Sequence, residues 1–120
     1  MRKNLYLLLT CLGLTLPALA ETPKTLNGKL VDENGLTLYV FDEDTIVGKS
    51  ACNEGCTATW PPAISKPSDK TITSWSFVTR IDGKQQWTYK GHPVYRFVMD
   101  HKTGDTNGDG IAGVWHTAKP

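Results

Sequence analysis

The chain has 120 residues, of which 13 are basic and 12 acidic, so its formal charge is close to neutral at +1. A near-neutral chain without a basic patch argues against nucleic-acid binding and against attachment to anionic membrane surfaces. Beyond the N-terminus, no apolar stretch is long enough to span a membrane. These features predict a small globular protein with a single domain and a modest core.

The first twenty residues have the pattern of a secretory signal peptide. Arg2 and Lys3 precede an apolar run, and a small-x-small pattern ends at Ala20. We expect cleavage after Ala20, which would place the mature chain, residues 21–120, in an oxidising extracytoplasmic compartment. Lipid attachment at Cys11 is the alternative, although the residue before it is larger than a lipoprotein signal prefers.

The mature chain begins with a polar lead, residues 21–25, which we expect to be mobile. Residues 29–41 are predicted to form a β-hairpin, because Asn34 and Gly35 form a turn dipeptide in which both positions tolerate positive φ. The strand after this turn carries apolar or aromatic side chains on both alternating faces. We therefore expect a strand that is covered on both sides.

A long loop, residues 42–67, follows the hairpin and contains Cys52 and Cys56. In an oxidising compartment, two thiols this close together are predicted to pair. Their spacing differs from that of a redox motif, and no second ligand pair completes a zinc site, so we interpret them as a structural disulfide. A short helical turn is expected near residues 56–60, ended by the prolines that follow.

The second half of the chain has four further predicted strands, at residues 72–80, 85–89, 93–98 and 114–117. Turns at residues 81–84 and at Lys90-Gly91 separate the first three, and a polar, glycine-rich loop at residues 101–113 precedes the last. No segment has apolar residues at helical spacing. The sequence therefore predicts a mainly β domain, a small antiparallel sandwich or barrel-like structure with long loops and one disulfide.

An internal repeat organises these strands. Residues of the first copy recur 56 positions later, as the pairs Gly35/Gly91, Tyr39/Tyr95, Phe41/Phe97 and Asp44/Asp100. A tryptophan follows in each half, Trp60 in the first and Trp115 in the second. We therefore predict two repeats, at about residues 29–62 and 85–117, whose paired strands pack about a pseudo-two-fold axis.

The repeats resemble a known protein family. Each copy contains the motif Tyr-x-(Phe/Trp/Tyr)-x-x-Asp, and the likeness continues through Cys52-x-x-x-Cys56, Trp60-Pro61-Pro62, Gln86-Trp87-x-Tyr89-x-Gly91, Gly104-Asp105 and Gly113-x-Trp115-His116. The chain is similar to a bacterial family of predicted lipoproteins named after this motif, also described as a secreted repeat of unknown function. The resemblance implies a secreted or periplasmic bacterial β domain, and it implies no catalytic residues.

The glycine-rich loop contains a candidate calcium site. Residues 105–110 fit Asp-x-(Asp/Asn)-x-(Asp/Asn)-Gly, the first half of a calcium loop, with Asp105, Asn107 and Asp109 as oxygen ligands and Asp100 as a further one. The position that normally carries the last, bidentate carboxylate is His116. The alternative is a turn in which these side chains accept hydrogen bonds from backbone N–H groups.

Two other sets of side chains are candidates for chemistry. Asp44 and Asp100 would form an acid/base pair of a hydrolase if the fold brings them together, or would cap the loops that follow them. Histidine and methionine are ligands of periplasmic copper, and the candidates in this chain are His92, Met99, His101 and His116.

The aromatic side chains are numerous for a chain of this size, and we expect them to form the core. If some of them line an open face, they would instead form a platform for a partner. The motif residues to which we assign a structural role are Tyr39, Phe41, Asp44, Trp60, Tyr95, Phe97, Asp100 and Trp115.

The sequence has no phosphate-binding loop before a helix and no serine or cysteine in a nucleophile motif. We therefore predict a non-enzymatic binding or envelope-interaction module, periplasmic or secreted, with an unknown protein or glycan partner in the cell envelope. Its working surface is expected in the loops after Asp44 and Asp100. The alternatives are a metal-binding protein, with calcium favoured over copper, and a carboxylate-dependent hydrolase.

Overall fold

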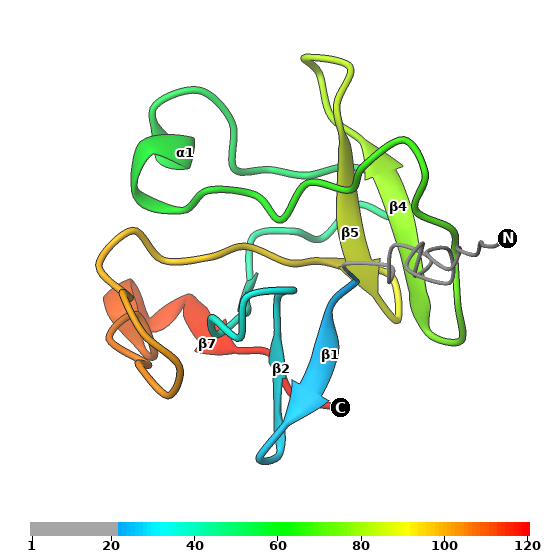
Figure 1. Cartoon of the computed structure of the whole chain (residues 1–120). Helices are drawn as coiled ribbons and strands as arrows, with labels where there is room; N and C mark the ends of the chain where they lie inside the picture. The colour runs from blue at the N-terminus through cyan, green and yellow to red at the C-terminus, as the bar shows by residue number, and fades with distance from the viewer. Residues whose placement is uncertain (1–21) are drawn as a thin grey trace, which may run out of the picture.

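The computed structural model describes residues 22–120, which form a mainly β structure with long loops (Figure 1). The predicted signal peptide and Cys11 lie outside the described residues. The strands are β1 (Lys24–Leu26), β2 (Lys29–Val31), β3 (Tyr39–Phe41), β4 (Trp75–Thr79), β5 (Gln85–Tyr89), β6 (His92–Pro93) and β7 (Trp115–Thr117). A helical turn, α1 (Cys56–Thr59), and a 3-10 turn, η2 (Ile111–Gly113), complete the elements. The predicted mainly β class is confirmed.

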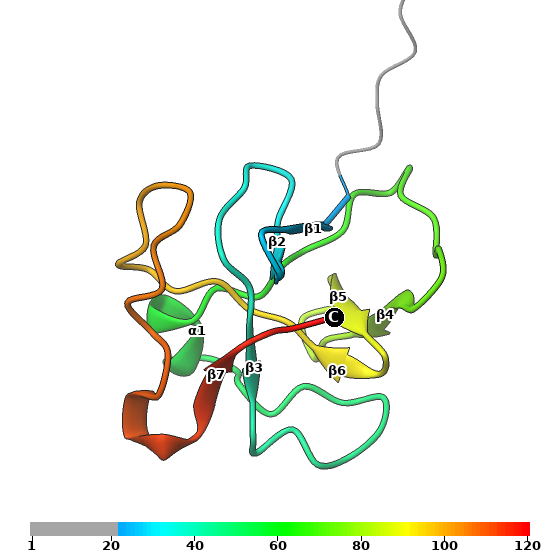
Figure 2. The same ribbon diagram turned by 90° about the horizontal axis from the view of Figure 1, so that it is seen from below.

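The strands form three small antiparallel sheets, ordered β1-β2, β3-β7 and β4-β5-β6. Strand β3 lies beside β7, so the first repeat contacts the end of the second (Figure 2). On its other side, β3 meets the second repeat again, because Tyr39 and Tyr95 exchange two backbone hydrogen bonds of 2.8 and 2.9 Å. The segments around Tyr39 and Tyr95 therefore pair with each other, although Tyr95 lies beyond the end of β6.

The N-terminal lead is shorter than predicted. Residues 24–26 form β1, which pairs with β2 through a two-residue turn in which Asn27 and Gly28 have φ values of 53° and 77°. This is the Asn-Gly turn geometry that was expected instead at Asn34-Gly35. There the chain does turn back, but only Gly35 has a positive φ, of 85°.

The turn at Asn34-Gly35 is built by a side chain that the sequence analysis did not use. The Asp32 carboxylate accepts hydrogen bonds from the backbone N–H groups of Asn34 and Leu36, both at 2.9 Å. An aspartate at the start of a turn commonly acts in this way. The expected turn therefore forms, with a different backbone geometry.

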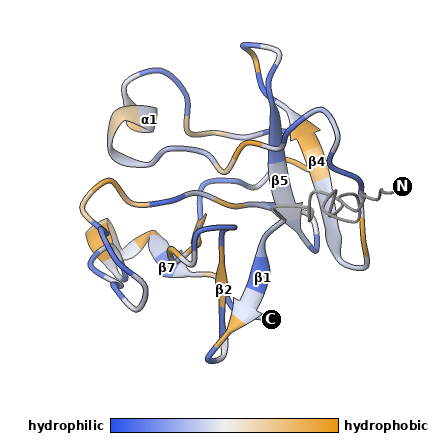
Figure 3. Ribbon diagram, viewed as in Figure 1, coloured by the Kyte–Doolittle hydropathy of each residue, from blue (hydrophilic) through white to orange (hydrophobic). Residues whose placement is uncertain are grey.

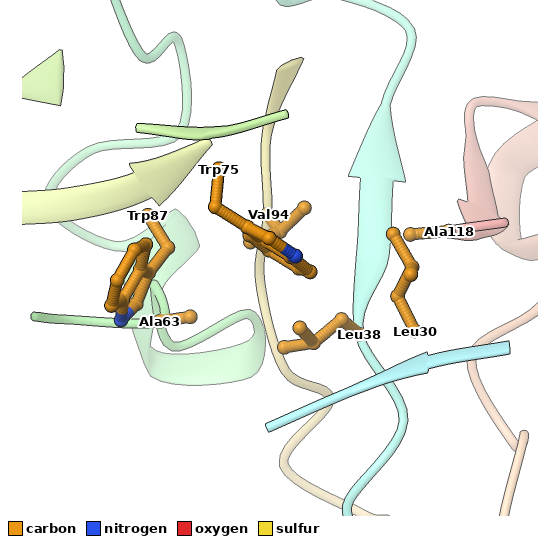
Figure 4. Close-up of a cluster of buried hydrophobic side chains, with 7 residues drawn as sticks. All are labelled: Leu30, Leu38, Ala63, Trp75, Trp87, Val94 and Ala118. Atoms are coloured by element: carbon orange, nitrogen blue, oxygen red, sulfur yellow. The ribbon is translucent and has the colours of Figure 1, made fainter. Parts of the chain in front are cut away.

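Two hydrophobic clusters lie on the two faces of the central strands. Leu38, which precedes β3, belongs to the first cluster, and the next residue, Tyr39, belongs to the second. The first cluster consists of Leu30, Leu38, Ala63, Trp75, Trp87, Val94 and Ala118 (Figure 4). The second consists of Tyr39, Cys52, Trp60, Tyr95, Phe97 and Trp115. The prediction of a strand covered on both faces is confirmed, and it follows from the alternation of side chains along a strand.

The hydropathy pattern along the ribbon agrees with this arrangement. In Figure 3 apolar residues mark β2 and much of β4, whereas the loop between Asp100 and η2 is largely hydrophilic. The repeat aromatics are buried, with Tyr39 and Tyr95 at 0 % exposure and Trp60 and Trp115 at 4 %. These rings are core residues, as expected, and do not form an open platform for a ligand.

The loop after β3 contains the predicted disulfide and the predicted helical turn. Cys52 and Cys56 are bonded, with their Cα atoms 5.4 Å apart, and α1 begins at Cys56. The backbone N–H of Trp60 donates to the carbonyl of Cys56 and ends the turn. Pro61 and Pro62 follow, where a helix could not continue.

Candidate functional site

Each repeat tyrosine contacts the aspartate of the other repeat. The Tyr39 hydroxyl donates to Asp100 Oδ2 at 2.5 Å, and the Tyr95 hydroxyl donates to Asp44 Oδ2 at 2.9 Å. This exchange accompanies the antiparallel bridge between Tyr39 and Tyr95, and each hydroxyl reaches the loop of the opposite half. The two copies are therefore interlocked rather than stacked side by side.

The other carboxylate oxygen of each aspartate caps the loop that follows it. Asp44 Oδ1 accepts a hydrogen bond from the Ala51 backbone N–H at 2.6 Å, and Asp100 Oδ1 accepts one from the Asn107 N–H at 3.0 Å. Ala51 and Asn107 are again 56 positions apart. The structure thus gives both carboxylates the loop-capping contacts that were the alternative to an acid/base pair.

The aromatic rings of the motif form a column between the two halves. Phe41 stacks on Trp115 with centroids 4.1 Å apart, and Trp115 stacks on Trp60 at 3.8 Å with an angle of 4° between the planes. Phe97 continues the column beyond Trp60 at 4.6 Å. Buried aromatic contacts of this kind stabilise a small core, which supports the structural role assigned to these residues.

Burial changes the acidity of three groups in this region. Burial, together with the hydrogen bond to Asp100, raises the pKa of Tyr39 far above its ordinary value. Burial also raises the pKa of Tyr95, to about 12. The pKa of Asp44 is raised as well, mainly by desolvation, although the Ala51 N–H and the Tyr95 hydroxyl oppose this change. Both tyrosines are therefore neutral hydrogen-bond donors at physiological pH.

The two Tyr–Asp sites differ in what lies next to them. Beside Tyr95, the Ser50 hydroxyl lies 2.5 Å from the phenolic oxygen, and Ser50 in turn accepts a hydrogen bond from Arg80 Nη1 at 3.0 Å. The phenolic oxygen of Tyr39 instead accepts a hydrogen bond from the Gly108 backbone N–H at 3.2 Å. The Tyr95–Asp44 site is therefore connected through Ser50 to the buried Arg80 side chain, whereas the contacts given for the Tyr39–Asp100 site include no cation.

Arg80 is a functional candidate that the sequence analysis missed. Its side chain is 5 % exposed, and its Nη atoms donate to Ser50 Oγ, Gln86 Oε1, Asn53 Oδ1 and the carbonyl of Cys52 at 2.8–3.0 Å. Its Nε atom is also buried but has no hydrogen-bond partner. Among the described residues, no other buried side-chain nitrogen or oxygen lacks one. Within residues 22–120, no carboxylate lies within ion-pair distance of the Arg80 guanidinium. Nothing in the sequence around Arg80, a charged residue at the end of a predicted strand, indicates that its side chain is buried.

Arg80 lines a groove of about 480 Å³, hereafter the groove, which lies between residues 53–64 and residues 80–84. The Pro61, Pro62 and Ile64 side chains form apolar lining on one side, and Ile81 contributes from the turn between β4 and β5. Ile81 is 77 % exposed and Ile64 is 38 % exposed. A concave surface with apolar walls and few fixed polar groups is typical of small-ligand sites. Part of it comes from the loop after Asp44, where a working surface was predicted.

A second hollow of about 410 Å³ lies on another part of the surface and includes Asp44, Lys90 and His92. Its lining also contains Asp42, which pairs with His116 at 2.8 Å. Its lining contains both positive and negative side chains, and none of the described residues that line it has a buried side-chain nitrogen or oxygen without a hydrogen-bond partner. It is a weaker candidate for a specific ligand site than the groove.

The candidate calcium ligands contact backbone groups in the described structure. Asp105 Oδ2 accepts hydrogen bonds from the N–H groups of His101 and Lys102, at 2.8 and 3.1 Å, and Asp109 Oδ1 accepts one from Thr117 at 3.0 Å. The hydrogen bond from the His101 amide is the main reason why the pKa of the Asp105 carboxyl is lowered. These are the contacts expected of a capped turn.

The Asn107 side chain also contributes to this loop. Its Nδ2 atom donates to Asp100 Oδ1 at 3.1 Å and to the carbonyl of Met99 at 3.4 Å. Of the candidate copper ligands, His92, Met99 and His101 are exposed, and His116 pairs with Asp42. Within residues 22–120, no three His, Cys, Asp or Glu side chains form a group that could hold a metal ion. Metal binding remains a prediction for experiment.

A family model described as a secreted repeat of unknown function matches the sequence twice, at residues 22–64 and 76–119. These two stretches contain the two tyrosine motifs and agree with the internal repeat. No curated protein and no solved structure matches the sequence significantly. Among the described residues, no helix is long and apolar enough to cross a membrane.

Proposed function

Since the chain belongs to this family of secreted repeats of unknown function, we propose that it is a non-enzymatic, extracytoplasmic binding module that holds a ligand in the groove. The ligand is expected to come from the cell envelope or its surroundings, where a secreted protein acts. The proposal assigns the duplicated tyrosine motif to the scaffold and the groove to binding.

The observation that carries the proposal is the exposure of apolar side chains at a rigidly built concave surface. Ile81 is 77 % exposed at the edge of the groove, and with Pro61, Pro62 and the 38 % exposed Ile64 it offers apolar surface to a ligand. The disulfide holds one side of the groove, and the hydrogen-bonded turn from Arg80 to Lys84 holds the other. A site on rigid elements loses little conformational entropy when a ligand binds.

The scaffold role of the motif residues supports the non-enzymatic part of the proposal. Each repeat aspartate bonds to a tyrosine with one oxygen and to a backbone amide with the other. A general acid or base must present its carboxyl group to a substrate. Neither Asp44 nor Asp100 lines the groove, where the ligand is proposed to bind.

The test is an NMR titration of the ¹⁵N-labelled secreted protein with envelope-derived fractions: peptides, glycans and small metabolites. We expect one fraction to shift the amide signals of Ile81, Gly83 and Lys84, and we expect Ile81→Ser to weaken that binding. Ile72→Ser is the matched control, because Ile72 is also exposed, at 51 %, but does not line the groove. Ligand binding of unchanged affinity in Ile81→Ser would contradict the assignment of the groove as the binding site. Turnover of a substrate that Asp44→Asn abolishes would contradict the non-enzymatic assignment.

A further inference from the structure

The chain contains three Asn-Gly pairs, at residues 27–28, 34–35 and 107–108, and asparagine is among the thermolabile residues. In such a pair the backbone nitrogen of the glycine attacks Cγ of the asparagine. The N–Cγ bond forms and the Cγ–Nδ2 bond breaks, so that Nδ2 leaves as ammonia with the proton of the backbone amide. Solvent water then opens the succinimide ring at either carbonyl group and leaves an aspartyl or an isoaspartyl residue. Glycine favours the attack because it has no side chain to hinder the approach of its nitrogen.

The first pair has both reacting groups free. Asn27 and Gly28 are exposed and form the two-residue turn between β1 and β2, which projects from the body of the molecule (Figure 1). The Asn27 side chain makes no hydrogen bond to any described residue, and neither does the Gly28 N–H. Within residues 22–120, no hydrogen bond of these groups therefore has to break before the Gly28 nitrogen approaches Cγ of Asn27.

The other two pairs are held by the fold. Gly35 is buried, and its N–H donates to the carbonyl of Asp32 at 2.9 Å. Gly108 is also buried, and its N–H donates to the Tyr39 hydroxyl at 3.2 Å. The Asn107 Nδ2 group, which would leave as ammonia, is itself hydrogen-bonded to a carboxylate at 3.1 Å. The reaction at either pair therefore requires local opening of the structure first.

The fold also determines what the change at residue 27 does to the protein. Among the described strands, β1 pairs only with β2, in a register that the two-residue turn sets. An isoaspartyl residue lengthens this turn, because its side-chain CH₂ group becomes part of the main chain. Neither hydrophobic cluster contains a residue from 22–28, so the core does not depend on that register.

From these contacts we infer that Asn27-Gly28 is a site of spontaneous deamidation in the secreted protein, and that its isoaspartyl product releases β1 from β2 while the core stays folded. Asn34 and Asn107 keep their amides for longer because of the hydrogen bonds around them. The inference goes beyond the proposed function, since the pair lies outside the groove.

The test is to incubate the full secreted protein in mildly alkaline buffer and to follow each Asn-Gly pair by peptide mapping with mass spectrometry. We expect Asn27 to deamidate at least about tenfold faster than Asn107, because the second pair must first lose two hydrogen bonds. In concentrated urea the three pairs should react at similar rates, because the unfolded chain lacks the protecting contacts. A reaction at Asn34 or Asn107 as fast as that at Asn27, or the same difference in urea, would overturn the assignment of the site.

The release of β1 is tested separately by hydrogen exchange of the purified isoaspartyl form. Its β1 amides should lose their protection, whereas those of β3 and β5 should keep theirs. Asn27→Asp is the matched control, because it carries the new charge without the additional main-chain atom and should retain the β1 protection. Isoaspartyl protein whose β1 amides stay protected, or an equal loss of protection in Asn27→Asp, would overturn the role of the lengthened turn.

Discussion

Replacing Tyr39 and Tyr95 separately by phenylalanine should show that two positions equivalent in the repeat contribute unequally to stability. Each change keeps the buried ring and removes only the phenolic oxygen. Both rings are 0 % exposed, and each hydroxyl bonds to the aspartate of the opposite half. The difference between the variants then depends on how well each aspartate can find another partner.

Tyr39→Phe is expected to be the more destabilising change. Asp100 is 6 % exposed, and Tyr39 is the one donor that the structure gives to its Oδ2 atom. Loss of a hydrogen bond to a buried charged group costs about 1.5–3 kcal/mol, and the Gly108 N–H, which donates to the same hydroxyl, would also lose its acceptor. The free energy of unfolding should therefore fall by on the order of 3–4 kcal/mol.

Tyr95→Phe is expected to cost less, about 1–2 kcal/mol. Asp44 is only partly buried, so water can replace the lost donor. The Ser50 hydroxyl, which touches the same phenolic oxygen, also keeps its hydrogen bond from Arg80. The two variants should thus differ by about 2 kcal/mol, although the sequence motif treats them alike.

The assay is equilibrium urea unfolding followed by tryptophan fluorescence, with Tyr89→Phe as the control. Tyr89 is an ordinary partly buried tyrosine whose hydroxyl makes no hydrogen bond to any described residue, so its loss should change stability by less than about 0.5 kcal/mol. Equal losses in the two motif variants, or a larger loss for Tyr95→Phe, would refute the reasoning from burial.

Four other changes have defined expectations. Gly108→Ala should lower stability by about 1–3 kcal/mol, because the new Cβ would lie 2.7 Å from a Trp60 ring carbon, whereas Gly55→Ala has no atom within 4 Å of its Cβ and should be nearly neutral in the same urea assay. The free energy of unfolding should fall as the pH rises from 10 towards 12, because tyrosines in the unfolded chain ionise near pH 10 whereas burial raises the pKa of Tyr95 to about 12. Thermal melts over this pH range should show a smaller loss of stability in Tyr95→Phe than in the unchanged protein. Reduction of the disulfide should cost about 2 kcal/mol and leave the protein folded at room temperature; calorimetry with and without reductant checks this, and complete unfolding would contradict it. Millimolar calcium should leave the melting temperature unchanged, because the Asp105 carboxylate already caps two backbone amides; a rise that Asp105→Ala abolishes would establish the calcium site instead.

Local patterns in the sequence were sufficient for the elements that depend on local forces. Strand β5 was predicted with its observed bounds, and the turns at Lys90-Gly91 and residues 81–84 form where expected. The alternation around Tyr39 correctly indicated two covered faces. The two-residue turn at Asn27-Gly28 carried an equally readable signal, but the residues before it were interpreted as a mobile lead because they are polar.

The candidate site was less accessible to sequence analysis. Arg80 lies in a strand-turn segment whose pattern does not differ from that of an exposed arginine, and its partners come from two separate stretches of the chain, residues 50–53 and Gln86. The Arg80 guanidinium can be buried only if the folded chain brings all of these hydrogen-bond acceptors to it. No periodicity or residue spacing in the sequence predicts that these acceptors meet.

The sequence by itself determined the mainly β class, the disulfide and the duplication, because strand alternation, cysteine proximity and a repeated motif are properties of short or regularly spaced segments. The tertiary structure decided that each tyrosine bonds to the aspartate of the opposite repeat rather than its own. It also decided that one repeat gained a neighbouring buried arginine and a groove, while the other did not. Both outcomes depend on contacts between distant residues, which a linear motif cannot specify. The contacts of the two tyrosine hydroxyls span 45 to 69 positions, and those of Arg80 with residues 50–53 span 27 to 30.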